Sequence, residues 1–575
     1  MLKAQSGQFS DGGLLTFHLT GSILRSATSD GQALFTLPHR HLQQGLRLAL
    51  DLAIAFLTNP SCPLRVDVNW SDPHIVHALV RSILSPKARL CGLDLLDLEA
   101  TIIPIVVETF LTIVPFVIEH PSEPLPIRMT QDSDRNSVRK STLYKHTVLI
   151  QYPVVSSKIA SQLPRRGARV LLFGITLDPT TPNDESEGGV YSSEDQSSST
   201  QARVNRLACL RALGDQIIRL NIDIILVQKF VPKYLHLYLA SQRTVVFDRL
   251  GYAHTRAVQL LSGAAVLGDA HVDEETMASS IGFLSEVDII EAGEKRFVRF
   301  QRTPEDANKA KQRPHADAAF LVSESRAFPV VTIALATTDS IAFEELSHAT
   351  HVALRRLVAM IVSESENASA VVAGAGCTEA YLAQWLRQHA EDLMAPLQSA
   401  AAADEHSFKR IGKRAQRQEI TARRSISDVV FAVADALESA VQFLLPSSRR
   451  SELQEVLLRL RDPDCTSNQA TSDFREKTKL FGVESTGQEE ILPVLAYEEA
   501  PSNLNDPDNG DLDSSEAESD GHDIERRVVS AFVVDSLSSK LRAIQSAIEC
   551  AAALARIGGA VCLQPSDTPA EEPGK

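Results

Sequence analysis

The chain has 575 residues, of which 44% are hydrophobic, and a formal net charge of -16. This length allows two or more domains with sizeable cores. The acidic balance argues against a nucleic-acid partner, because phosphate binding needs a basic stripe. The seven cysteines are scattered without a C-x-x-C spacing. We therefore expect free thiols in a reducing compartment, with neither a disulfide framework nor a metal site.

The beginning of the chain is polar and lacks the apolar stretch of a signal peptide. Phe9–Gly13 reads FSDGG, and Asp11 there is an ordinary residue for capping a helix that begins near Gly12. A helix is expected over Leu37–Leu57. The residues of its regular pattern are Pro38, Leu42, Gly45, Ala49 and Ala53.

One membrane-like run follows, at Ile102–Ile118. It is short and is interrupted by Pro104, Glu108 and Pro115. We therefore expect a buried helix there and no membrane span.

The middle of the chain alternates strands and helices. Val170–Leu177 and Ile222–Val227 are continuous apolar runs of strand length, typical of strands covered on both faces. Arg203–Leu220 has helical spacing between them. Asn221–Leu267 then reads as strand, Pro-started helix, strand and helix around a Gln-Lys corner at residues 228 and 229.

The last part of the chain contains a Gly-rich turn and a helix. Val371–Leu382, VVAGAGCTEAYL, predicts a strand, a turn and the start of a helix. The helix expected at the C-terminal end places four apolar residues on one face: Leu541, Ile544, Ile548 and Ala551.

In this order the phrases resemble the group II (TCP-1/cpn60) chaperonin family, over nearly the whole chain. Val80–Lys87 (VRSILSPK) and the helix after Asp535 also match family wordings. Four phrases resemble the McKusick–Kaufman/Bardet–Biedl syndrome branch: Phe9–Leu14, Val80–Leu84, Glu108–Pro115 and Gly376–Ala383. The resemblance implies a multi-domain α+β/α fold with a mostly helical equatorial domain, a small intermediate domain and an α/β apical domain.

The resemblance also implies nested domain boundaries. The equatorial domain is expected at 1–71, truncated at its start, and at 331–575. The intermediate domain is expected at 72–150 and 282–330, and the apical domain at 151–281. Three polar or charged segments are expected to be disordered insertions: 179–201, in place of the family's lid protrusion, 396–424 and 501–525.

The family's nucleotide site is only partly retained. No G-P-x-G loop occurs, and Gly13, Leu14 and Leu15 replace hydroxyls that would bind phosphate, which leaves Thr16. Glu344 stands where the family has its hydrolytic aspartate, and its longer side chain would displace the carboxylate; the alternative is an exposed helix-face glutamate. The resemblance implies these candidate residues: Asp11 and Glu344 for catalysis, and Asp11, Gly12, Gly13, Gly374 and Gly376 for nucleotide binding. The glycine turn alternatively serves packing alone.

The apical domain carries the expected client-binding residues: Lys229, Lys233, Arg249 and Arg256. Tyr234, Leu235 and Tyr238 recur at helical spacing, which favours a place in the core over client binding.

Two function classes remain open. The resemblance to the McKusick–Kaufman branch implies a chaperonin-like assembly factor without efficient ATP hydrolysis, whose clients are subunits of the ciliary BBSome complex. Its other partners would be chaperonin-like subunits and the cytosolic chaperonin, in the cytoplasm at the centrosome or basal body. The alternative is an ATP-dependent chaperonin subunit, with Mg-ATP as cofactor, whose phosphate loop is missing from this gene model.

Overall fold

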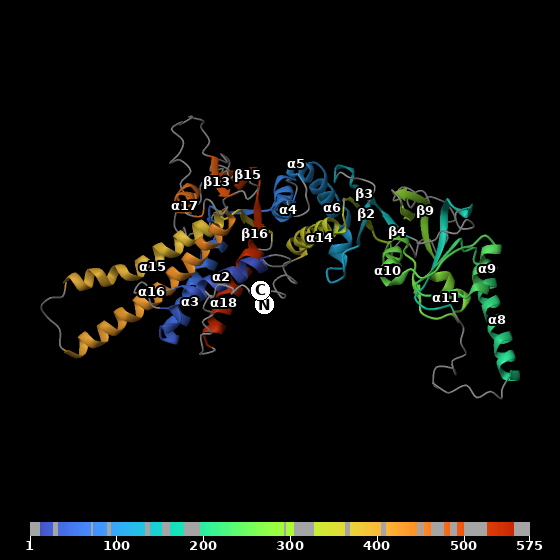
Figure 1. The fold of residues 1–575 in the computed structure, drawn as a ribbon, viewed down its shortest axis with the longest axis horizontal. Helices are drawn as coiled ribbons and strands as arrows, with labels where there is room; N and C mark the ends of the chain where they lie inside the picture. Colours follow the sequence, from blue (N-terminus) through green and yellow to red (C-terminus); the bar gives the residue numbers. More distant parts are fainter. Residues whose placement is uncertain are drawn as a thin grey trace, which may run out of the picture. The chain divides into compact units, whose positions relative to one another are not determined.

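The computed structural model describes residues 12–26, 31, 33–70, 73–88, 94–132, 138–151, 161–177, 196–292, 295–303, 327–337, 339–362, 369–403, 410–445, 450, 453–461, 477–483, 491–499 and 526–556. The chain forms two compact units. The first combines residues 1–82 with 359–575, and the second comprises residues 83–358. Figure 1 shows their helices and strands.

The first unit is mostly helical. Its helices are α2 (Gly13–Arg25), α3 (His39–Thr58), α15 (Cys377–Ala403), α16 (Arg410–Leu444), α17 (Leu453–Arg461) and α18 (Leu537–Ala555), while α4 (Pro73–Ala88) runs across the boundary. Helices α2, α3, α16 and α18 pack on one another, and α15 lies along α16 (Figure 1).

Small residues explain the close packing of α3 on α16. The helix expected at Leu37–Leu57 is present at His39–Thr58, and Leu42, Gly45, Ala49 and Ala53 of its pattern are buried, while Pro38 precedes the helix and is exposed. A Cβ added at Gly45 would come within 2.5 Å of the Cβ of Val429 on α16. The two backbones can therefore approach this closely only because residue 45 has no side chain.

Two small antiparallel sheets complete the first unit. One has the order β1-β12-β16, from Arg65–Asp67, Ala370–Ala373 and Val534–Ser536. The other has the order β13-β14-β15, from Lys477–Val483, Ile491–Glu499 and Arg526–Ala531. The central strand of the first sheet is fully buried and leads directly into the Gly-rich turn before α15.

The second unit begins with an apolar helical stretch. It consists of α5 (Leu95–Asp97), a π-helical turn (Leu98–Ile102) and α6 (Ile103–Glu119). Among the described residues, Leu98–Glu119 is the one stretch whose length and composition would suffice to cross a membrane. One face of α6 is buried, including Phe110 and Phe116, while Leu111 is exposed. The expected buried helix is therefore present, with one side open.

A three-stranded sheet follows in the order β2-β11-β3, from Ile127–Asp132, Val331–Ala336 and Thr142–Lys145. Strand β11 is fully buried and pairs with both neighbours, in parallel with β2 and antiparallel to β3. The boundary expected at residue 331 is therefore corrected, because β11 belongs with strands of the expected intermediate domain. Helix α14 (Ser340–Val362) comes next in the chain.

The larger sheet of this unit has seven strands. Its path is β4-β10-β9-β5-β6-β7, with β8 paired to β5. The strands are β4 (Thr147–Gln151), β5 (Arg165–Phe173), β6 (Ile224–Val227), β7 (Val245–Phe247), β8 (Val266–Leu267), β9 (Gly282–Ala292) and β10 (Lys295–Gln301). Its helices are α8 (Gln196–Arg219), α9 (Lys233–Ser241), α10 (Gly251–Ser262) and α11 (Glu274–Ser279).

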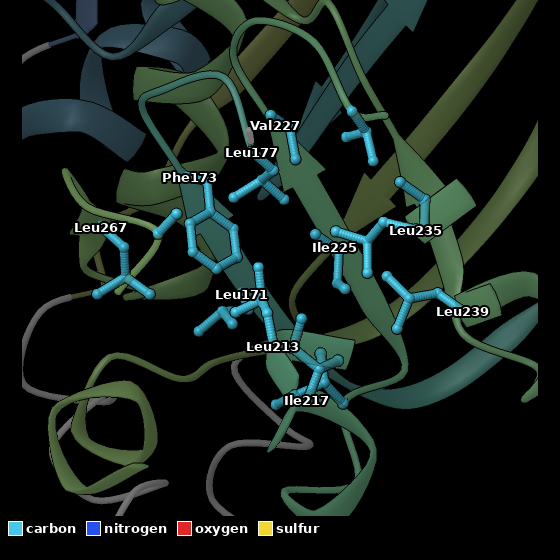
Figure 2. Packing of buried hydrophobic residues seen from close by; sticks show 14 of the residues in the cluster. Leu171, Phe173, Leu177, Leu213, Ile217, Ile225, Val227, Leu235, Leu239 and Leu267 are labelled. Atoms are coloured by element: carbon cyan, nitrogen blue, oxygen red, sulfur yellow. The ribbon is translucent and has the colours of Figure 1, made fainter. Parts of the chain in front are cut away.

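The predicted apolar runs form the centre of this sheet. Val170–Phe173 of β5 and all of β6 are completely buried, as expected for strands covered on both faces. Figure 2 shows how Phe173 and Ile225 of these strands pack with Leu213 of α8 and Leu235 of α9. This core holds α8 and α9 against the sheet.

Two domain boundaries are corrected by the strand pairing. Strands β9 and β10 join β5, β6 and β7 in one sheet, although residues 282–330 were expected in the intermediate domain. Strand β4 pairs with β10, although all of β4 except its last residue, Gln151, belongs to the expected intermediate segment 72–150. Pairing between strands distant in the sequence leaves no signal in local apolar patterns. The three-domain division itself stays a prediction.

The segments expected to be disordered have different outcomes. Helix α15 continues to Ala403 and α16 begins at Arg410, so most of 396–424 is helical and that expectation is wrong. Extending an existing helix costs less than nucleating one, which lets polar turns continue from packed ones. Helix α8 begins at Gln196, within the expected segment 179–201. Residues 178–195 and 501–525 lie outside the described residues.

Candidate functional site

The first candidate residues stand at the start of α2. Gly12 precedes the helix with φ 80°, a left-handed conformation that favours glycine, and Gly13 is the first helical residue. No acidic residue lies in the first turn, and no side chain caps it. Asp11 lies outside the described residues. The described part of this site therefore offers a glycine corner and a helix N-terminus.

The side chains of this first turn do not suit a phosphate. Leu14 is 87% exposed and Phe17 is 65% exposed, so apolar groups cover the outer side of the turn. The one remaining hydroxyl, on Thr16, is buried and donates to the carbonyl oxygens of Gly12 at 2.9 Å and Ala543 at 3.2 Å. The hydroxyl of Thr16 is therefore committed to the contact between α2 and α18.

The Gly-rich turn is packed against its own chain. The N–H of Gly374 donates to the carbonyl of Val533 at 3.0 Å, and the carbonyl of Ala375 accepts from the N–H of Val483 at 2.9 Å. A Cβ at Gly374 would lie 2.8 Å from Cγ1 of Val533. These contacts occupy one side of the turn with the strand segments around residues 483 and 533.

The other side of the turn faces α16. Gly376 has φ 82°, and a Cβ there would lie 3.0 Å from Cδ1 of Leu444. Val441, Val483 and Ala380 are buried in the same hydrophobic cluster. The glycines thus permit a close approach, but the atoms that approach them belong to this chain. The contacts described for Gly374, Ala375 and Gly376 agree with the packing alternative for the turn.

A buried ion-pair cluster joins the starts of α15 and α18. The ammonium group of Lys540 lies 2.6 Å from Oε1 of Glu379 and 2.8 Å from Oδ2 of Asp535. Burial by itself lowers the pKa of Lys540, but the carboxylates of Asp535 and Glu379 outweigh it and the net shift is upward. Lys540 is therefore charged, and it fixes Glu379 close to the Gly-rich turn.

The sequence alone did not reveal this cluster. Glu379 lies far in the chain from Asp535 and Lys540, so no local pattern brings the three residues together. The available signal was a lysine on an otherwise apolar helix face, since buried lysines need a partner. The neighbouring Cys377 is also buried, and burial raises the pKa of its thiol, so that it stays protonated.

Glu344 belongs to the second unit. It lies in the first half of α14, where its side chain is exposed. The glycine residues of the nucleotide prediction are in the first unit. The exposed position is the one that the alternative interpretation, a helix-face glutamate, expects.

The expected client-binding residues lie at one end of the seven-stranded sheet. Lys229 follows β6, and Lys233 is the first residue of α9; both are exposed. The guanidinium of Arg249 lies 5.6 Å from the ring centre of Phe230. Arg256 instead pairs with Glu123, so it is held within the unit. Three of the four residues therefore share an accessible region.

The residues of helix α9 that were expected in the core lie on two different faces, one buried and one exposed. Leu235 is completely buried, as expected, and Leu239 joins it. Tyr234 is 40% exposed, and its ring stacks on that of Tyr238 with 6.3 Å between centres. The core expectation is therefore wrong for Tyr234, because the exposed face of a short helix begins one residue away from its buried face.

Sequence reasoning missed two exposed apolar residues beside the cations. Phe230 is 42% exposed and Leu237 is 51% exposed. Helical geometry could have identified Leu237, because it lies on the face of α9 opposite Leu235 and Leu239.

The chain is similar to proteins of one known family. The model of the TCP-1/cpn60 chaperonin family matches residues 1–562. The human "Molecular chaperone MKKS" is 24% identical over 384 residues, 66% of this chain, and its Mus musculus counterpart is 23% identical over the same length. The chain spans only 59% of the length of these relatives.

A solved structure supports the same grouping at the level of fold. The open state monomer of a group II chaperonin from Methanococcoides burtonii has a TM-score of 0.50 and 13% identity, covering 95% of this chain and 99% of that one. The identity is low enough for this likeness to concern the fold alone. The multi-domain arrangement of helices and sheets and the family match over nearly all residues agree, and the chain belongs to the TCP-1/cpn60 chaperonin family.

Proposed function

We propose that this protein is a chaperonin-like assembly factor that holds client or partner chains on its apical region without efficient ATP hydrolysis. Membership of the chaperonin family and the similarity to molecular chaperones support the first part of the proposal. The second part rests on one observation: the hydroxyl of Thr16 points into the protein, toward Ala543.

The fit to Mg-ATP is poor among the described residues. Phosphate needs hydrogen-bond donors, and the accessible side chains of the first turn of α2, Leu14 and Phe17, are apolar. The turn at Gly374 and Gly376 is approached by Val533 and Leu444. These contacts favour a structural use of both glycine-rich segments.

The client and the cellular setting follow from the resemblance to the McKusick–Kaufman branch. Under this proposal the clients are BBSome subunits, and the partners are other chaperonin-like subunits and the cytosolic chaperonin. The work would take place in the cytoplasm, at the centrosome or basal body. Depleting the protein from ciliated cells should then reduce the amount of assembled BBSome in a sedimentation gradient, and unchanged assembly would contradict this part.

The nucleotide part is tested on the full-length protein. We expect isothermal titration with Mg-ATP to show no binding and an ADP-release assay to show no turnover. The variants Asp11→Ala and Glu344→Ala should behave as the unmodified protein does. Turnover that either variant abolishes would establish the alternative, an ATP-dependent chaperonin subunit.

The holding activity needs its own measurement. A chemically denatured model protein, diluted into buffer, should aggregate more slowly in the presence of this protein and without ATP. Light scattering reports the rate, and an equal mass of serum albumin serves as the control. Aggregation at the rate of the control would end the proposal of a holding factor.

A further inference from the structure

Three exposed apolar side chains follow one another closely in the chain, between the end of β6 and the middle of α9. They are Phe230, Tyr234 and Leu237, which are 42%, 40% and 51% exposed. Exposed apolar residues that lie together mark interaction sites more often than isolated ones do. Because α9 is anchored by its buried residues Leu235 and Leu239, it presents Tyr234 and Leu237 from a fixed position.

Cations lie beside these apolar residues, two of them as neighbours in the chain and one through a ring contact. Lys229 and Lys233 are exposed, and neither has an ion-pair partner within the described residues. The guanidinium of Arg249 lies over the ring of Phe230, and its side chain is 74% exposed. Arg249 also forms a long ion pair with its neighbour Asp248, with 3.9 Å between Nε and Oδ2. These positive charges stand out in a chain of net charge -16.

The backbone fixes the two segments side by side. The N–H of Arg249 donates to the carbonyl of Lys229 at 2.6 Å, and the N–H of Gly251 donates to that of Gln228 at 3.1 Å. Arg249 and Gly251 both have positive φ, at 59° and 69°. The corner after β7 is thereby tied to the corner after β6, so the cations and the aromatic ring keep their spacing.

We infer that Lys229, Phe230, Lys233, Tyr234, Leu237 and Arg249 form a cationic–aromatic surface that binds acidic amphipathic segments of partner proteins. This inference rests on the proposed function and names the chemistry of the segments that are held. Apolar side chains of the segment would contact Phe230, Tyr234 and Leu237, which provide most of the binding energy. Glutamate and aspartate side chains would lie near the lysines and select the partner by charge.

A pair of synthetic peptides tests the charge requirement. Each carries Leu and Phe at helical spacing, with Glu at the remaining positions in one peptide and Lys in the other. Fluorescence anisotropy with full-length protein should show binding of the Glu peptide that is about tenfold tighter than that of the Lys peptide. Raising the salt from about 0.05 to about 0.5 M should weaken it, because exposed charges are screened.

Variants locate the site. The double variant Lys229→Glu with Lys233→Glu should bind the Glu peptide about tenfold more weakly and the Lys peptide more tightly. Leu237→Ser should weaken the binding of both peptides. The matched control is Arg355→Glu, a charge reversal at an exposed position of α14, which should bind as the unmodified protein does. Circular dichroism and thermal unfolding confirm that each variant is folded.

The outcomes separate this inference from the proposed function. Equal binding of both peptides, or loss of binding in the Arg355 variant to the same degree, overturns the cationic–aromatic surface. So does failure to bind either peptide by a protein that still slows aggregation of a denatured client. If aggregation is not slowed either, the holding function itself is wrong. Tight, salt-sensitive binding of the Glu peptide that depends on Lys229 and Lys233 establishes the surface.

Discussion

Thr16 and Lys540 are polar residues whose side chains are buried in the first unit and bonded to neighbouring groups. The hydroxyl of Thr16 is bonded to the backbone of α18, and the ammonium group of Lys540 is held by Glu379 and Asp535. A buried charge is tolerated only while it keeps its partners. The two residues therefore stabilise the packing of α2, α15 and α18.

Replacing Lys540 with Met should lower the free energy of unfolding by about 3 to 5 kcal/mol at neutral pH, because two carboxylates would be left without their cation. The native pKa of Lys540 is raised, so its contribution is complete below the ordinary lysine pKa of about 10.4 and is lost as pH rises through the native pKa. Urea unfolding at neutral and at strongly alkaline pH measures both effects.

Two further variants control this prediction. Lys145→Met breaks an exposed ion pair with Glu108 and should cost less than about 1 kcal/mol. Adding Glu379→Gln to Lys540→Met should recover part of the loss, since one buried charge is removed. An unchanged unfolding midpoint for Lys540→Met would show that the cluster does not stabilise the fold.

At the scale of elements, the Gly-rich turn before α15 packs closely against neighbouring side chains. Gly376→Ala should destabilise the protein by more than Gly167→Ala. Both positions have positive φ, which costs a residue with a Cβ about 1 to 2 kcal/mol. Only Gly376 also faces another side chain, that of Leu444 at 3.0 Å, whereas nothing lies within 4 Å of a Cβ at Gly167. Equal losses in urea unfolding would argue that the turn is not packed.

Elements with a clear period could be predicted from the sequence. Strands β5 and β6 are continuous apolar runs, and α3 and α18 show apolar or small residues at helical spacing, as with Ile544 and Ile548. The helical residues near Arg410 lacked such a stripe and were interpreted as disordered. The pairing of β9 with β5, of β10 with β4 and of β11 with β2 could not be read from local patterns, because these partners lie far apart in the chain.

The candidate nucleotide site stays a prediction. The replacement of phosphate-binding hydroxyls by Leu14 and Leu15 is visible in the sequence. The inward direction of the Thr16 hydroxyl depends on how α2 meets α18, and no local pattern reports that contact. The exposed ring of Tyr234 could not be predicted for the same reason, because the way α9 packs on the sheet determines which of its side chains are buried.

At the scale of the whole molecule, the chain gathers both of its ends into one unit and its middle into another. Units with separate cores can unfold separately. We therefore expect two transitions in differential scanning calorimetry. Leu386→Ala, in the core of the first unit, should shift one of them, and Leu226→Ala, in β6, the other. Each should cost its unit about 2 to 5 kcal/mol.

The assignment of the two transitions provides its own control. Leu237→Ala removes an exposed side chain from the second unit. It should change the free energy of unfolding of either unit by no more than about 0.5 kcal/mol. If the two core variants shift a single common transition, the units unfold as one cooperative structure.

The packing of the Gly-rich turn has an evolutionary consequence. Placing a threonine at Leu14 would add a hydroxyl, yet Val533 and Leu444 would still pack against the Gly-rich turn. Removing those side chains would expose a hydrophobic cluster that now supports α16 and α17. Under the proposed function, regaining ATP hydrolysis would therefore require several changes at once, with less stable proteins along the way. Such a path works as a ratchet: once a lineage has filled this turn, selection for stability keeps it filled.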